Sequence, residues 1–124
     1  MQPTTTTPAA ILIVEDDPMM LQILTSVLRK HLPTAEIIAV STGRRALDQL
    51  AQRPIPLLVT DYNLPGISGL QLARIVKTQR PGTCVVLMSG ETLDSVMPGI
   101  DYYDKVLGSF TIWRRAGLLD TTLL

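Results

Sequence analysis

Acidic and hydroxyl side chains follow three short apolar segments in this sequence. The segments and the residues after them are 10–14 (AILIV) with Glu15 and Asp16, 57–60 (LLVT) with Asp61, and 84–88 (CVVLM) with Ser89. If the segments are neighbouring strands of one parallel sheet, their carboxyl ends meet at one edge and three carboxylates converge there. Crowded carboxylates repel one another, which raises at least one pKa, and a hard divalent cation relieves the repulsion. Oxygen-only ligands favour Mg²⁺, so the sequence predicts a Mg²⁺ site at Glu15, Asp16 and Asp61.

A simpler interpretation of these acids is that they cap helices or lie in solvated loops. It suits Asp17, because Pro18 follows it and proline favours the first position of a helix. Capping does not require acids after two separate strands, so we favour the metal site for Glu15, Asp16 and Asp61.

The elements that must position these residues alternate between strands and helices. Short runs rich in branched apolar residues predict strands, and apolar residues at helical spacing between Pro, Gly and capping residues predict helices. The predicted strands are 10–14, 37–40, 57–60, 84–88 and 100–103, and the predicted helices are 18–32, 46–53, 69–80, 91–97 and 110–118. This alternation predicts an α/β fold, a doubly wound five-stranded parallel sheet in the flavodoxin-like order 2-1-3-4-5, with helices on both faces.

Length and composition narrow the class of protein. The 124 residues predict a flexible tail over 1–9 and one domain over 10–124. The 11 basic and 11 acidic residues balance, which argues against nucleic-acid binding through this domain. No apolar run is long enough to cross a membrane and no signal peptide is evident, so we expect a cytoplasmic protein. The single cysteine, Cys84, excludes an intramolecular disulfide and a cysteine zinc cluster.

Four motifs in order give the chain a resemblance to the receiver domain of bacterial two-component response regulators. They are ILIVEDDP (11–18), DYNLPGISG (61–69), Ser89-Gly90 and DYYDK (101–105). Asp61 lies 45 residues after Asp16, and Ser89 lies 28 residues after Asp61. The resemblance extends over Ala10 to Phe110.

The resemblance implies that Asp61 accepts a phosphoryl group from a histidine kinase or a phosphotransfer protein. Mg²⁺ would be held by Glu15, Asp16, Asp61 and the backbone carbonyl of Asn63. The resemblance also assigns Lys105 to pair with the phosphoryl group, Ser89 to bind it as the switch hydroxyl, and Tyr102 to act as the switch aromatic. Asn63 and Glu91 would tune the attack of water on the acyl phosphate. The protein would not be an enzyme beyond phosphorylating and dephosphorylating itself.

Two features depart from the family pattern. Val106 follows Lys105, where receivers usually have a proline after a cis peptide bond, and cis before another residue costs about 2.5–4 kcal/mol. Only 16 residues separate Ser89 from Lys105, so the predicted helix over 91–97 is short. A short helix there leaves apolar surface near Tyr102 and Trp113, which suggests a homodimer or a partner contact on that face.

Two other functions stay open on the sequence alone. One is a receiver-like interaction module that does not switch by phosphorylation, suggested by the altered region after Lys105. The other is a Mg²⁺-dependent phosphohydrolase, although Asp61-Tyr62-Asn63 lacks the second acid that such enzymes often carry two residues on. The chain could be a stand-alone signalling protein or part of a longer regulator.

Overall fold

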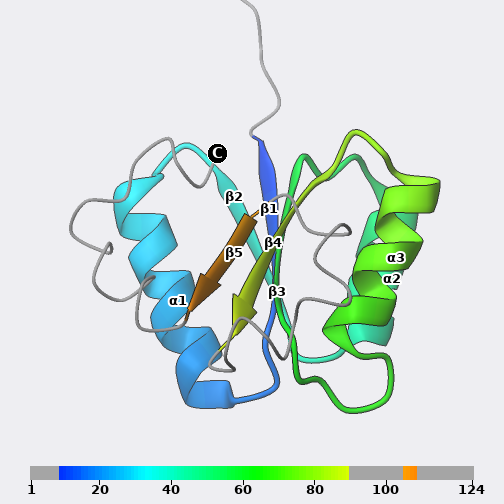
Figure 1. The fold of residues 1–124 in the computed structure, drawn as a ribbon. Coiled ribbons are helices and arrows are strands. Elements are labelled where there is room, and N and C mark those ends of the chain that lie inside the picture. Colours follow the sequence, from blue (N-terminus) through cyan, green and yellow to red (C-terminus); the bar gives the residue numbers. More distant parts are fainter. Residues whose placement is uncertain (1–8, 90–104, 109–124) are drawn as a thin grey trace, which may run out of the picture.

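The computed structural model describes residues 9–89 and 105–108, and its centre is a five-stranded parallel sheet in the order β2-β1-β3-β4-β5. The elements are β1 (Ala10–Val14), α1 (Pro18–His31), β2 (Glu36–Val40), α2 (Gly43–Gln52), β3 (Leu57–Asp61), α3 (Gly69–Gln79), β4 (Cys84–Ser89) and β5 (Lys105–Gly108). Figure 1 shows α1 on one face of the sheet and α2 with α3 on the other. The predicted fold class and strand order are confirmed.

The middle of the sheet is buried because helices cover both of its faces. All five residues of β1 are buried, and they alternate between two cores as successive side chains of a strand do. Leu12 and Val14 join the core under α2 and α3, whereas Ile11 and Ile13 join the core under α1. Continuous apolar runs are typical of such strands, which explains why the sequence predicted them well.

Side-chain caps fix where the helices begin. Asp17 Oδ1 accepts a hydrogen bond from the Met19 N–H at 3.0 Å, and Pro18 occupies the first turn of α1. Ser68 and Gln71 form a reciprocal capping box at the start of α3, with N–H to oxygen distances of 3.0 and 3.2 Å. The sequence predicted the Asp17 cap, and the two caps fix where α1 and α3 begin after the ends of β1 and β3.

The predicted fifth strand, 100–103, lies outside the described residues. The strand that the structure places beside β4 is Lys105–Gly108. Lys105 therefore begins β5, opposite Val86, instead of following the strand. Val106 explains the difference: unlike a proline, it keeps its N–H and suits a strand, so the chain continues as a strand past Lys105.

The predicted helices over 91–97 and 110–118 and the tail over 1–8 also lie outside the described residues. Within the part of the chain that is described, none of the helices has the length and apolar character that crossing a bilayer requires.

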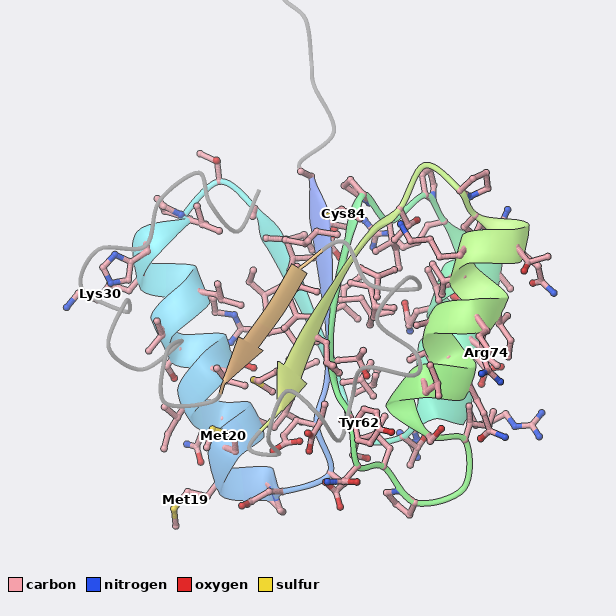
Figure 2. The ribbon with its side chains drawn as sticks, viewed as in Figure 1. Met19, Met20, Lys30, Tyr62, Arg74 and Cys84 are labelled. Carbon is pink, nitrogen blue, oxygen red and sulfur yellow. The ribbon has the colours of Figure 1, made fainter. Side chains whose placement is uncertain are left out.

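Figure 2 shows Tyr62 near the carboxyl ends of the strands and Cys84 at the opposite end of the sheet. The polar residues of interest therefore gather at one end of the sheet.

Replacing Ser68 with alanine should lower the free energy of unfolding by about 1 kcal/mol, because the Gln71 backbone N–H in the first turn of α3 loses its acceptor, the Ser68 hydroxyl. Urea denaturation followed by circular dichroism measures the change. Ser26→Ala, an exposed serine inside α1, is the matched control and should leave stability unchanged or slightly raised. Equal effects of the two variants would show that the capping box does not stabilise α3.

Candidate metal centre

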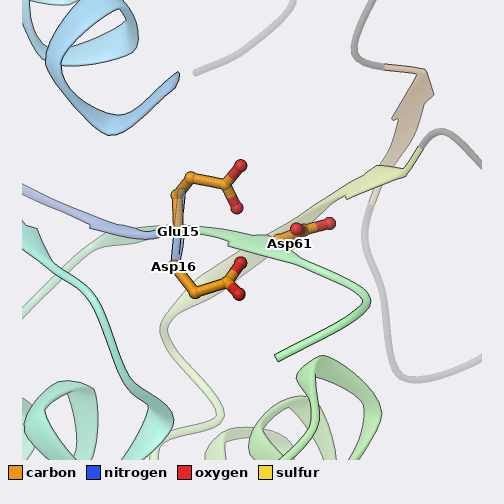
Figure 3. Close-up of side chains that lie close together, drawn as sticks. All are labelled: Glu15, Asp16 and Asp61. Carbon is orange, nitrogen blue, oxygen red and sulfur yellow. The ribbon is translucent and has the colours of Figure 1, made fainter. Parts of the chain in front are cut away.

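Three carboxylates converge at the carboxyl end of the sheet. Glu15 and Asp16 follow β1, Asp61 ends β3, and the two strands pair directly, with Val14 opposite Thr60. One oxygen from each carboxylate lies within 4.8 Å of one from each of the others, and Figure 3 shows the three side chains close together. The structure thus brings together the three acids that the sequence predicted as a cluster.

Glu15 is the buried member of the cluster. It is 6 % exposed, whereas Asp61 is half-buried and Asp16 is exposed. Burial raises the pKa of Glu15 to about 8, helped by a hydrogen bond to the Asp61 carboxyl and by the negative charges of Asp61, Asp16 and Asp17. At neutral pH without a cation, Glu15 is therefore mostly protonated. The sequence predicted a raised pKa from repulsion among the acids, and burial is the larger cause of the shift.

The donor set fits a hard divalent cation. Glu15 Oε2 is buried with no hydrogen-bond partner among the described residues, which is costly for a carboxyl oxygen unless something binds it. The three acids supply oxygen ligands only, and the exposed side of Asp16 leaves room for water ligands, which Mg²⁺ usually keeps. A cation here would satisfy the orphaned oxygen and remove the repulsion at once.

The loop after Asp61 is held by short backbone contacts. The Tyr62 N–H donates to the Met88 carbonyl at 3.2 Å, and the Gly69 N–H donates to the Tyr62 carbonyl at 3.0 Å. A Cβ at Gly69 would overlap the Asp61 carbonyl oxygen, so only glycine lets α3 begin this close to β3. Gly66 has φ of +76°, a conformation that favours glycine, at the bend of the loop. These contacts fix the backbone that carries Asp61.

One contact of this loop was not predicted from the sequence. A Cβ at Gly43, the first residue of α2, would lie 2.9 Å from the Ile67 carbonyl oxygen. The start of α2 therefore supports the loop after Asp61 from the side. The available signal was a glycine directly after the cap residue Thr42, but a lone glycine in a sequence does not reveal its neighbour.

The other predicted site residues are less completely placed. Ser89 ends β4, one residue beyond Met88, which pairs with Asp61. Lys105 pairs with Val86, three residues and about 10 Å before Ser89 along the strand. Asn63 is exposed in the loop after Asp61. Tyr102 and Glu91 lie outside the described residues.

The structure combines a doubly wound α/β sheet with an acidic cluster at its carboxyl edge, and comparison with known proteins supplies the family. The model of the response regulator receiver domain matches residues 11–101. This chain belongs to that family. Receivers are phosphoacceptors rather than enzymes in the ordinary sense, and response regulators receive phosphoryl groups from histidine kinases or phosphotransfer proteins.

Individual relatives support the same family assignment. The chain is 36 % identical over 81 residues to the response regulator protein FleR of Pseudomonas aeruginosa, covering 65 % of this chain and 17 % of FleR. It is 31 % identical over 98 residues to the DNA-binding response regulator MtrA of Mycolicibacterium smegmatis, covering 79 % of this chain and 38 % of MtrA. The chain thus spans less than half the length of these curated relatives.

Solved structures show the same fold. The response regulator TrrA of Thermotoga maritima, determined in complex with Mg²⁺-BeF, superposes with a TM-score of 0.80 at 23 % identity, covering 94 % of this chain and 99 % of that one. The receiver domain of an HD-domain protein from Pseudomonas fluorescens gives 0.79 at 23 % identity, covering 90 % of each chain.

Replacing Glu15 with glutamine should stabilise the metal-free protein at alkaline pH. Because the folded-state pKa of about 8 exceeds the ordinary 4.5, the folded state binds more protons than the unfolded state between these values, and stability falls as pH rises through that window. We expect the Tm of Glu15→Gln at pH 8.5, with a chelator present, to exceed that of the wild type by at least about 4 °C.

Thermal melts from pH 5 to 9 measure the difference. The exposed Asp48→Asn on α2 is the control for loss of one negative charge and should follow the wild type. A Glu15→Gln profile parallel to the wild type would contradict the burial of an ionisable Glu15.

Proposed function

We propose that this chain takes a phosphoryl group onto Asp61, with Mg²⁺ held beside it. The convergence of Glu15, Asp16 and Asp61, with one buried carboxyl oxygen left unpaired, carries the proposal. It is the arrangement that a cation-dependent acceptor carboxylate requires, and membership of the receiver family supports it. The alternative of an interaction module without phosphorylation is not favoured, because such a module has no need of three crowded acids.

The proposed reaction transfers phosphorus from nitrogen to oxygen. A carboxylate oxygen of Asp61 bonds to the phosphorus of a phosphohistidine on the kinase or phosphotransfer protein while the P–N bond breaks. The electron pair of that bond stays on the imidazole, which leaves as a neutral ring when its other nitrogen carries a proton. The product on this chain is an acyl phosphate.

The acids and the loop would hold the cation that this reaction needs. Glu15, Asp16, Asp61 and the backbone carbonyl of Asn63 are the proposed ligands. When bound, Mg²⁺ offsets the negative charge on the transferred phosphoryl oxygens. Glu15 would give up its proton and serve as a charged ligand, because the charge of a bound cation would outweigh the effect of burial.

Ser89, Lys105 and Tyr102 complete the proposal as the switch. Ser89 would hydrogen-bond the phosphoryl group, and Tyr102 would turn inward as the Ser89 loop moves, which converts a local charge change into a change of surface. Lys105 would pair with the phosphoryl group. Since it begins β5 instead of ending it, we expect a smaller contribution from Lys105 than a lysine at the carboxyl edge would make. We also propose that the protein acts in the cytoplasm.

The wild type should gain one phosphoryl group from a small acyl phosphate in the presence of Mg²⁺, and Asp61→Asn should gain none, because an amide is not a competent acceptor. Intact-mass spectrometry measures the gain. Asp48→Asn, which removes an exposed acid elsewhere, is the control and should be phosphorylated like the wild type. Labelling that persists in Asp61→Asn, or that a chelator leaves unchanged, would refute the assignment.

The acyl phosphate should be short-lived, because Asn63 and Glu91 are polar residues that can orient an attacking water molecule. The double variant Asn63→Met/Glu91→Leu should retain its phosphoryl group several times longer than the wild type. A chase after removal of the phosphodonor measures the decay. The pair Gln22→Met/Gln49→Leu, exposed on α1 and half-buried on α2, keeps the same kind of change away from the site, and an equal decay in all three proteins would argue against water positioning.

We further propose a homodimer or partner contact through the region around Tyr102 and Trp113, where the sequence concentrates aromatic and apolar residues. Sedimentation equilibrium should then give a mass above that of the monomer, and Trp113→Ala should shift it toward the monomer while circular dichroism stays unchanged. A wild type that is monomeric at high concentration, with fully shielded Trp113 fluorescence, would remove the basis for a homodimer.

A further inference from the structure

Basic residues gather on α2 and α3, the two helices on the side of the sheet away from α1 (Figure 1). These helices and the C-cap of α3 carry five of the chain's 11 Lys and Arg but only one of its 11 Asp and Glu. The five bases, called the basic face below, are Arg44, Arg45, Arg74, Lys77 and Arg80. Asp48 is the single acid. A neutral chain therefore presents a concentrated positive region on one side.

The basic face is accessible to a partner. Lys77 is half-buried and the other four bases are exposed, and Figure 2 shows Arg74 on the side of α3 away from the sheet. Arg53, which caps the end of α2, is left out of the count because Glu36 binds it through two hydrogen bonds of 2.6 and 2.7 Å. The five residues of the basic face are therefore separate from the ion pair between Arg53 and Glu36.

Helix stability does not explain the position of Arg44 and Arg45. They lie in the first turn of α2, which has no acidic residue, and the helix dipole disfavours cations at that end. Two arginines at the destabilising end of a helix, beside a neighbouring helix that is also basic, suit a negatively charged partner better than they suit the fold.

An apolar trough lies between α2 and α3, and Arg80 of the basic face lines it. A hollow of about 330 Å³ between α2 and α3 is lined by Leu47, Leu50, Ala51, Ile75, Val76, Gln79 and Arg80. A second hollow of about 660 Å³ shares Ala51 and Arg80 with it and continues to Pro56 and Thr83, just before β3 and β4 begin. The trough therefore extends toward the amino end of the sheet, away from the acidic cluster.

We propose that the trough and the basic face together bind an acidic amphipathic helix of another protein. Its apolar side would sit against Leu47 and Ile75, and its acidic side would face the arginines, which is the usual way in which a helix occupies a groove. Charge complementarity selects the acidic partner. The aliphatic trough selects protein over nucleic acid, because α2 and α3 contain no aromatic side chain on which a base could stack.

The test measures binding of a fluorescent helical peptide of about 18 residues with leucine on one side and glutamate on the other. A matched peptide with glutamine in place of every glutamate is the probe control. Anisotropy is measured on the unphosphorylated protein without Mg²⁺, so the outcome does not depend on the function proposed for Asp61. We expect the glutamate peptide to bind at least about tenfold more tightly than the glutamine peptide at low salt, and salt to weaken it.

Variants locate the binding. Arg44→Glu/Arg80→Glu should weaken the glutamate peptide by about tenfold or more, whereas Arg29→Glu/Lys30→Glu, which reverses two exposed bases on α1, should change its affinity little. Ile75→Ser should weaken binding of the glutamate peptide because it removes apolar surface from the trough. Circular dichroism should confirm that this variant keeps its fold. Equal losses in the two charge-reversal variants, no binding by the wild type, or tighter binding of oligothymidine or of anionic vesicles than of the peptide would overturn the proposal.

Discussion

Repulsion among Glu15, Asp16 and Asp61 is the interaction on which this site depends. The parallel pairing of β1 with β3 places the ends of both strands at one edge, so the backbone positions of the three acids cannot separate without breaking the register. Burial of Glu15 sharpens the conflict, because it withdraws one of the carboxyl groups from the water that would otherwise screen it. The fold thus maintains an unfavourable charge arrangement that a bound cation would relieve.

The surrounding elements keep this arrangement in place. Both faces of β1 are packed against separate cores, which fixes the strand that leads into Glu15. At β3, the close approach of Gly69 to the Asp61 carbonyl and the support of the loop by Gly43 limit the movement of the acceptor residue. Packing in the rest of the domain thus holds in place three acidic residues that would otherwise move apart. Such a balance is typical of functional sites, where local strain persists because the scaffold determines it.

Much of the fold and the acidic cluster could be predicted from the sequence, for identifiable reasons. Unbroken apolar runs such as residues 10–14 mark strands covered on both faces, and Asp17 and Ser68 carry cap chemistry that depends on a few adjacent residues. The cluster of three acids followed once the strand order was known. Contacts between distant segments were not predictable in this way. The packing of Gly43 on Ile67 depends on the angle at which α2 meets the sheet, and nothing near either residue encodes it.

The placement of Lys105 within β5 was not predicted, because the resemblance put this lysine after the strand. Val106 and Leu107 favour a strand by themselves, and the usual proline that would end it is missing. The grouping of five bases on α2 and α3 was likewise hidden by a net charge of zero, which averages over the whole surface.

Calorimetric titration of the metal-free protein with Mg²⁺ at pH 7, repeated in buffers of different ionisation enthalpy, tests the central claim most directly. Because the pKa of Glu15 is about 8 before the cation binds, the account predicts saturable binding with release of about one proton, and Glu15→Gln should bind more weakly and release almost none. Binding without proton release, or unchanged binding and release in Glu15→Gln, would contradict it.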